Sequence, residues 1–202
     1  MTEIIPNEAF VTQNYDKICD LVAKNDEIDS PLSKMIAFLG DRYALCPASA
    51  NVEYYSAFPG GLIYHTLHLL QWVGRFANLM APNVYQKNTL LKISILSEIG
   101  KVGDLNDDYF IPTTTKWQKD KGFMYEINPK VSYMRMNQRC LYLAKEFNIP
   151  LSSEEYVSIL LSDKLNDDNE SYRYKEPDLA LILQNANQWS QRLESKNIIQ
   201  YV

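Results

Sequence analysis

Residues 60–80 read GGLIYHTLHLLQWVGRFANLM. Apolar residues recur through this stretch at the spacing of an α-helix, so that one face of the helix is apolar. Two glycines stand at its start, and Pro82-Asn83 follows its end, as expected for residues that bound a helix. The stretch predicts a long helix whose apolar face packs against other helices.

Most of the remaining chain shows the same periodicity. Ser30-Pro31 reads as an N-cap followed by proline at the first helical position, and Ser152 with Glu155 has capping-box spacing. The further predicted helices span residues 15–24, 31–43, 89–101, 132–148, 152–161 and 177–195. The chain has 202 residues and no internal repeats. These features predict an all-α fold in a single domain, residues 1–202.

Residues 104–130 differ from the helical segments. Polar and aromatic residues alternate there, two prolines interrupt the stretch, and the helical period is absent. A loop this long in a compact domain is usually functional or disordered, and its aromatic residues argue against disorder. We predict a structured insertion containing a small hairpin with arms Tyr109–Pro112 and Phe123–Ile127.

Composition limits the function classes. A net charge of −5 and an isoelectric point of about 5.1 argue against direct nucleic-acid binding. Cys19, Cys46 and Cys140 have neither metal-ligand spacing nor a disulfide framework. The first residues lack the pattern of a signal peptide, and no apolar run reaches the ~18 residues of a membrane span. We therefore expect a cytoplasmic protein without membrane contact.

The two histidines, His65 and His68, lie one turn apart on one face of the predicted 60–80 helix. Such a pair can bind a metal ion, but usually with further ligands from elsewhere in the chain. The alternative is structural: one interior histidine bonded to a backbone carbonyl, and one that faces solvent. Spacing alone favours the structural alternative.

The segments AFPGGLIYHTLHLL and LLKISILSEIGKVGD resemble the HD-domain phosphohydrolases, and more narrowly the HD-like proteins of large bacteriophages. The DYFIP…W…K…MYEINP insertion, the LSSEEYVSILLSD helix and the ANQWSQRLE terminus follow in the order that this resemblance leads one to expect. It implies an HD-like helical bundle and a phage origin. In the family, one or two divalent metal ions bound by His and Asp residues support phosphate-ester hydrolysis.

The residues at the implied metal positions depart from that pattern. His65 stands where the family has its first His ligand, and Ser97-Glu98 stands in place of the His-Asp pair. Asn187 stands in place of the closing Asp. Ser162 occupies a position at which an additional His often occurs in the phage relatives. The resemblance therefore implies a vestigial site.

A serine hydroxyl is a poor ligand for a divalent ion compared with imidazole, and Asn187 lacks the negative charge of aspartate. Without a metal ion there is no water of lowered pKa to serve as nucleophile. We expect no metal, no cofactor and no catalytic residues, and hence a pseudoenzyme.

An inactive HD-like protein of phage origin would act by binding and modulating a host protein, for example in transcription, replication or defence. The candidate contact residues are the aromatic residues of the insertion, because aromatic anchors with a polar rim are typical of interface hot spots. They are Tyr109, Phe110, Trp117, Phe123 and Tyr125. These rings could equally pack the insertion onto the helices. A weaker candidate is the loop Asp163–Glu176, with Tyr172, Arg173 and Tyr174.

Two other functions stay open. The remnant pocket could act as a nucleotide sensor or a residual phosphohydrolase, with Lys101 reaching phosphate and Tyr64 or Trp72 stacking on a base. Glu98 would then serve as a metal-independent general base, whereas its structural alternative is an ion pair with His65 or Lys101. A role as a virion component is the third possibility, with no particular support from the sequence.

Overall fold

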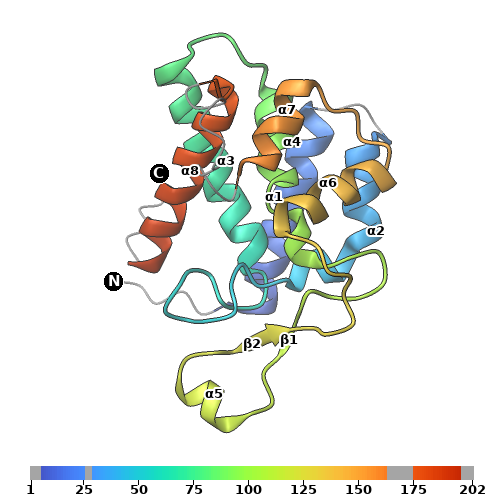
Figure 1. The fold of residues 1–202 in the computed structure, drawn as a ribbon, viewed down its shortest axis with the longest axis vertical. Coiled ribbons are helices and arrows are strands. Elements are labelled where there is room, and N and C mark those ends of the chain that lie inside the picture. Colours follow the sequence, from blue (N-terminus) through green and yellow to red (C-terminus); the bar gives the residue numbers. More distant parts are fainter. Residues whose placement is uncertain (1–5, 26–28, 163–174, 197–202) are drawn as a thin grey trace.

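The computed structural model describes residues 6–25, 29–162 and 175–196, and these are mainly helical (Figure 1). The helices are α1 (Glu8–Asn25), α2 (Pro31–Leu45), α3 (Gly61–Met80), α4 (Lys87–Leu96), α5 (Lys116–Asp120), α6 (Met136–Glu146), α7 (Ser153–Leu160) and α8 (Asp178–Ser195), with a short 3-10 helix, η1 (Ile99–Val102). The mainly helical fold expected from the periodicity is confirmed. None of the described helices has the length and apolar character needed to cross a membrane.

The predicted N-caps are confirmed. The Ser30 hydroxyl accepts a hydrogen bond from the backbone N–H of Ser33, with Pro31 at the first helical position of α2. At the start of α7, Ser152 and Glu155 form the reciprocal capping box, at 3.2 and 2.8 Å. These bonds satisfy backbone donors that the first turn of a helix leaves free, so both starts are fixed by local sequence.

Helix α3 lies at the centre of the packing. Leu62 and Ile63 near its start belong to one buried cluster, which also takes residues from α1, α2, α4 and α6. Leu69 and Val73, further along α3, belong to a second buried cluster formed with α8. Because one helix serves both clusters, the side chains between them are positioned by packing from both sides.

Three predicted boundaries were wrong, and one of them is the start of α6, which is Met136 rather than residue 132. Helix α1 begins at Glu8 rather than residue 15, because the Asn7 side chain caps it by accepting from the backbone N–H of Phe10 at 2.9 Å, and Phe10 packs on Tyr64 of α3. Helix α4 ends at Leu96 rather than at 101, and the chain then turns into η1. At Gly100 an added Cβ would lie 2.8 Å from the backbone oxygen of Met136, so the close approach of α6 to η1 needs glycine.

The insertion contains the predicted hairpin. Strand β1 (Phe110–Pro112) pairs antiparallel with β2 (Tyr125–Ile127), and Phe110 stands opposite Ile127. No pattern in the sequence indicated the short helix α5 between the strands. Figure 1 shows the hairpin and α5 projecting from the helical body. The Asn51 side chain donates to the backbone oxygen of Lys121 at 3.1 Å, so the loop before α3 supports the insertion from one side.

Candidate functional site

Three of the four implied metal positions converge between α3, η1 and α8. His65 of α3 is completely buried, Glu98 precedes η1, and Asn187 lies on α8. His65 Nε2 lies 3.1 Å from Oδ1 of Asn187 and 3.7 Å from Oε2 of Glu98. Residues far apart in the sequence thus form one buried polar cluster, which we call the His65 network.

Ser97, the fourth metal position, and Ser162, the additional position of the phage relatives, do not join this network. The Ser97 hydroxyl is buried and donates to the backbone oxygen of Ser94 at 3.3 Å, one turn earlier in the chain. The Ser162 hydroxyl, also buried, donates to the backbone oxygen of Ile159 at 2.8 Å. Both serines therefore bond within their own helical turns, and neither hydroxyl bonds to a residue of the network.

Both ring nitrogens of His65 face hydrogen-bond acceptors. Nδ1 lies 2.9 Å from Oε1 of Glu194, and Nε2 faces Oδ1 of Asn187. The orientation of the Asn187 amide is fixed because its Nδ2 donates to Oε1 of Glu98 at 2.9 Å, while Oδ1 also accepts from Gln191 Nε2. Since a carboxylate and an amide oxygen only accept, this arrangement is satisfied when both nitrogens of His65 carry protons, that is, when the ring is an imidazolium.

A second buried cation balances the second carboxylate. The Lys101 ammonium donates to Oε2 of Glu98 and, at 2.7 Å, to the hydroxyl of Tyr55. Tyr55 also accepts from Gln191 at 3.2 Å, and its ring lies 4.8 Å from the ring of His65. The network therefore holds two carboxylates, Glu98 and Glu194, with two cations. This arrangement has the form of the structural alternative for Glu98, in contact with both His65 and Lys101.

Glu194, Tyr55 and Gln191 belong to the network but were not among the candidate residues of the sequence, and Glu194 is the most important of them. It is buried, its Oε2 accepts from the Ser56 hydroxyl at 2.5 Å, and its Oε1 lies 3.3 Å from Nδ1 of His68. Glu194 lies two turns after Asn187 on the same side of α8, and this spacing was the available signal. A carboxylate near the end of a predicted helix resembles an ordinary solvated residue, so the signal was weak.

The glycine pair before α3 brings the Ser56 segment into place. Gly60 has a φ of 82°, and an added Cβ at Gly61 would lie 2.0 Å from the backbone oxygen of Ser56. Only glycine permits this approach.

The predicted structural alternative for the histidines was wrong in detail. His65 bonds to side chains rather than to a backbone carbonyl, and the His68 side chain is only 14% exposed.

The charges of the network shift the pKa values of its members. Burial alone would lower the pKa of His65, but the Glu194 and Glu98 carboxylates together outweigh burial and raise the pKa. Burial would raise the pKa of Glu194, but the His65 imidazolium and its hydrogen bonds hold it at about 2. Burial would likewise raise the pKa of Glu98, and Lys101 and His65 lower it instead. Each carboxylate is held ionised by a buried cation.

This donor set does not fit a metal ion. A metal ligand must offer a lone pair, and both nitrogens of His65 are committed as donors in the geometry of the network. The Lys101 ammonium already supplies the positive charge beside Glu98. Within the described residues, no three His, Cys, Asp or Glu side chains are arranged so that they could hold a metal ion.

The insertion presents its five aromatic candidates unequally. Trp117 on α5 has an exposed fraction of 62%, and Lys121 lies 3.8 Å from its ring centre. Phe110 packs against the main buried cluster, and the Arg139 guanidinium lies 4.6 Å from the ring centre of Tyr109. Phe123 and Tyr125 are half-buried. Trp117 is therefore the clearest surface candidate, and Phe110 and Tyr109 help to pack the insertion onto the body.

The weaker candidates Tyr172, Arg173 and Tyr174 lie outside the described residues.

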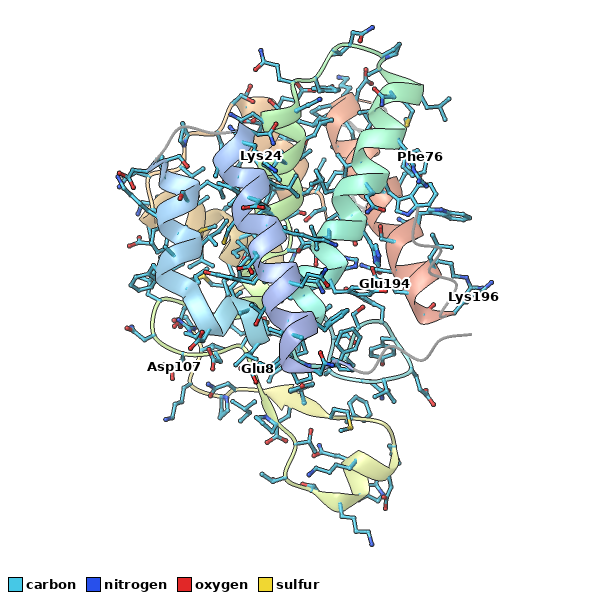
Figure 2. The ribbon with its side chains drawn as sticks, turned by 180° about the vertical axis from the view of Figure 1, so that it is seen from behind. Glu8, Lys24, Phe76, Asp107, Glu194 and Lys196 are labelled. Carbon is cyan, nitrogen blue, oxygen red and sulfur yellow. The ribbon has the colours of Figure 1, made fainter. Side chains whose placement is uncertain are left out.

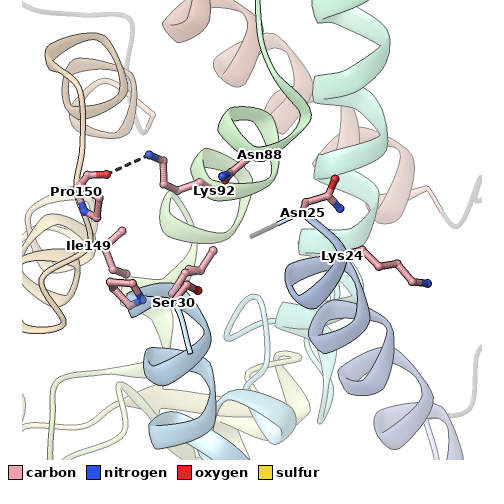
Figure 3. Close-up of a pocket in the computed structure, with 9 residues that line it drawn as sticks. Lys24, Asn25, Ser30, Asn88, Lys92, Ile149 and Pro150 are labelled. Atoms are coloured by element: carbon pink, nitrogen blue, oxygen red, sulfur yellow. Dashed lines mark hydrogen bonds between the residues drawn. The ribbon is translucent and has the colours of Figure 1, made fainter. Parts of the chain in front are cut away.

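A separate cavity of about 570 Å³ lies among α1, α2 and α4, away from the His65 network (Figure 3). The Lys92 ammonium in this cavity donates to the Pro150 backbone oxygen at 3.0 Å and pairs with Glu155 at 2.8 Å. Its charge is thus satisfied within the protein.

Comparison of the chain with protein-family models, with curated proteins and with solved structures found no significant match. The HD-domain assignment therefore stays a prediction that rests on the motifs quoted above and on their order.

The network predicts how stability depends on pH. The folded pKa of His65 lies above its ordinary value of 6.5, so its stabilisation is complete below pH 6.5 and is lost as the pH rises through the folded pKa. The pKa of Glu194 falls from 4.5 to about 2, so its stabilisation is complete above pH 4.5 and is lost as the pH falls towards 2. The free energy of unfolding should therefore be highest between pH 4.5 and 6.5.

Urea unfolding as a function of pH measures the loss of stability on the acid side and on the alkaline side. On the acid side the free energy of unfolding should fall by about 3 kcal/mol, because a shift of one pKa unit corresponds to about 1.4 kcal/mol. His65→Asn should remove the part of the alkaline loss that comes from the raised pKa of His65. An unchanged alkaline loss in that variant would show that His65 is not the titrating group.

Proposed function

We propose that this chain is a catalytically inactive HD-like protein of bacteriophage origin that binds and modulates a host protein. The observation that carries the inactive half is the commitment of both His65 nitrogens as donors to Glu194 and Asn187. A site whose imidazole donates at both nitrogens, and whose carboxylates are each neutralised by a side chain, has no ligand left for an ion that would activate water.

The competing nucleotide function has less support. Lys101 was its phosphate-binding candidate, yet the ammonium is already bonded to Glu98 and Tyr55. Of the two stacking candidates, Tyr64 is 3% exposed, and Trp72 is partly exposed on the outer side of α3. A panel of nucleoside mono-, di- and triphosphates tests this function by thermal shift and by phosphate release. A shift that Lys101→Met abolishes would favour the nucleotide function over the proposed one.

The binding half rests on the projecting insertion and on the exposure of Trp117 at its α5 helix. An exposed tryptophan with lysines around it supplies rigid apolar area and a polar rim, which is the composition of interface hot spots. The backbone of the insertion is held at both strands and at Asn51, so the tryptophan is presented on an ordered support. Little ordering entropy would then be lost on binding.

Trp117→Ala should abolish capture of the host protein and leave the free energy of unfolding within about 0.5 kcal/mol of wild type. The measurement is quantitative mass spectrometry of the proteins that immobilised wild-type and variant chains retain from bacterial lysate. Tyr133→Ala is the matched control, because Tyr133 is a fully exposed aromatic residue outside the insertion. The same proteins retained by wild type and Trp117→Ala would remove the insertion as the contact surface.

Tyr109 is a less suitable probe of binding. Its ring packs against Arg139, whose side chain is buried and donates to the backbone oxygen of Ser132 at 2.8 Å. Truncating Tyr109 would change the packing of the insertion as well as any contact surface, so loss of binding in that variant would have two explanations.

A further inference from the structure

The outer faces of α3 and α8 carry almost no negative charge in an otherwise acidic protein. The chain has 25 aspartates and glutamates, yet none lies between Glu53 and Glu98, a segment that includes all of α3. Helix α8 has only two, Asp178 at its start and the buried Glu194. Most of the negative charge therefore lies elsewhere on the molecule.

Aromatic residues from both helices meet on this face. The rings of Trp72 and Trp189 contact each other edge to face, with centres 5.8 Å apart, and Phe76 lies one turn beyond Trp72 at 6.0 Å. Trp189 is 45% exposed, and the other two are partly exposed. Figure 2 shows Phe76 on α3 and Lys196 just after α8 at the same edge of the molecule.

Two arginines flank the aromatic residues. The Arg75 guanidinium lies 4.7 Å from the centre of the Trp72 ring, and Arg192 follows Trp189 by one turn of α8. Both arginines are exposed, and neither forms an ion pair with any residue that the structure describes. Within the part of the chain that the structure describes, no carboxylate neutralises these two charges.

Exposed aliphatic side chains lie in the last turn of α3 and just after it. Leu79, Met80 and Val84 have exposed fractions of 78%, 46% and 64%. Together with Trp72, Phe76, Trp189, Arg75 and Arg192 they form what we call the aromatic–arginine face. Exposed aliphatic area favours a protein partner over nucleic acid, because aliphatic side chains neither stack on bases nor bind phosphate.

We propose that the aromatic–arginine face binds an acidic amphipathic helix of a partner protein. The apolar side of such a helix would cover the tryptophans and Leu79, and its carboxylates would pair with Arg75 and Arg192. Tryptophan and arginine are the residue types most enriched among interface hot spots, and an apolar face rimmed by charge is the usual receptor for an amphipathic helix.

This inference rests on the proposed function in one respect, that the chain acts through protein contacts. It uses a different surface from the insertion, because Trp117 lies on α5 at the projecting end of the molecule (Figure 1). The two surfaces can therefore be tested separately with single variants.

The test is fluorescence anisotropy with a labelled peptide of about 18 residues, which spans ~27 Å as a helix. The peptide carries leucine and phenylalanine on one helical face and glutamate on the other. We expect saturable binding that weakens as salt is raised, and no binding of a scrambled peptide of the same composition or of a peptide with lysine for glutamate. Equal binding of the three peptides would overturn the proposal.

Variants then locate the binding site. Arg75→Glu combined with Arg192→Glu should weaken binding by about ten-fold or more, and so should Trp189→Ala. The arginine variant changes only exposed residues, so it keeps the test valid if Trp189→Ala folds poorly. Lys119→Glu, a charge reversal on α5, is the matched control and should leave the affinity within about two-fold. Unchanged binding by the double arginine variant would overturn the proposal.

Other occupants give different results in the same experiments. Tighter binding of labelled oligo-dT than of the acidic peptide, lost in the double arginine variant, would replace the proposal with nucleic-acid binding. Concentration-dependent dimers in sedimentation, also lost in that variant, would replace it with a second copy of the chain. If the peptide did not bind, the predicted role of Trp117 in capturing a host protein would be unaffected. If the His65 network supported metal-dependent hydrolysis, the proposed function would fail, but the result of the peptide titration would still stand.

Discussion

Glu194→Gln is expected to lower the free energy of unfolding by about 3 kcal/mol, the cost of removing one partner from a buried ion pair. The Glu194 carboxylate contacts the ring nitrogen of His65, the Ser56 hydroxyl and His68. Glutamine keeps the shape but removes the charge, so the buried His65 imidazolium would lose its main counter-charge. Urea unfolding near pH 6 measures the change directly.

Glu146→Gln is the control for this variant. The Glu146 side chain faces solvent and lies 3.9 Å from the Lys145 ammonium in an exposed pair, so its loss should change stability by no more than about 0.5 kcal/mol. If the Glu194 and Glu146 variants were equally stable, Glu194 would not be a structural partner of His65, and the closed network would have to be abandoned.

Lys101→Met is expected to cost about 3–5 kcal/mol, because it leaves the Glu98 carboxylate buried without its nearest cation. Adding Glu98→Gln to this variant should restore part of the loss, since the buried charge is then gone from both sides of the pair. Urea unfolding of the two single variants and the double variant gives the interaction free energy, which we expect to be about 2 kcal/mol.

Additive losses in this double-mutant cycle would contradict the assignment of Lys101 as the counter-charge of Glu98. Lys92 with Glu155 offers a comparison within the same protein, because this pair is also mostly buried and lies at 2.8 Å. A cycle on that pair shows how much coupling an ion pair outside the His65 network produces under the same conditions.

The sequence was most informative where local patterns decide the structure. The Ser30 cap, the Ser152–Glu155 capping box and the hairpin were all predictable, because each depends on residues a few positions apart. The start of α1 was missed although the Asn7 cap is local, because the helical period before residue 15 is weak and contact between Phe10 and Tyr64 across the fold supports the first turns. Tertiary contacts extend helices beyond what periodicity alone supports.

The candidate site was predictable only in part. The motif positions of His65, Glu98 and Asn187 identified three residues that do meet. Nothing local indicated that Tyr55 would join the network, and the spacing of Glu194 after Asn187 was only a weak signal, because the bonds of the network join α8 to α3 and to the loop before it. The residue types at the motif positions indicated the chemistry of the site. Which further side chains bond to them depends on the packing of α8 on α3.

The insertion shows the same limit. Its aromatic residues were recognised as a group, but the sequence did not separate surface residues from packing residues. Phe110 packs against the main cluster from a strand that is paired with β2, and the ring of Tyr109 packs against Arg139 of α6. Both contacts are made by residues distant in the sequence. Trp117 is exposed because α5 projects beyond both.

Native mass spectrometry with manganese, iron or zinc titrated into protein purified without chelators tests the central claim most directly. We predict that no stoichiometric ion binds, because the His65 nitrogens donate to Glu194 and Asn187 and Lys101 neutralises Glu98. One or two ions that bind stoichiometrically, and are lost in His65→Ala, would contradict the account. The network would then open to accept metal, and the protein would have to be treated as an enzyme.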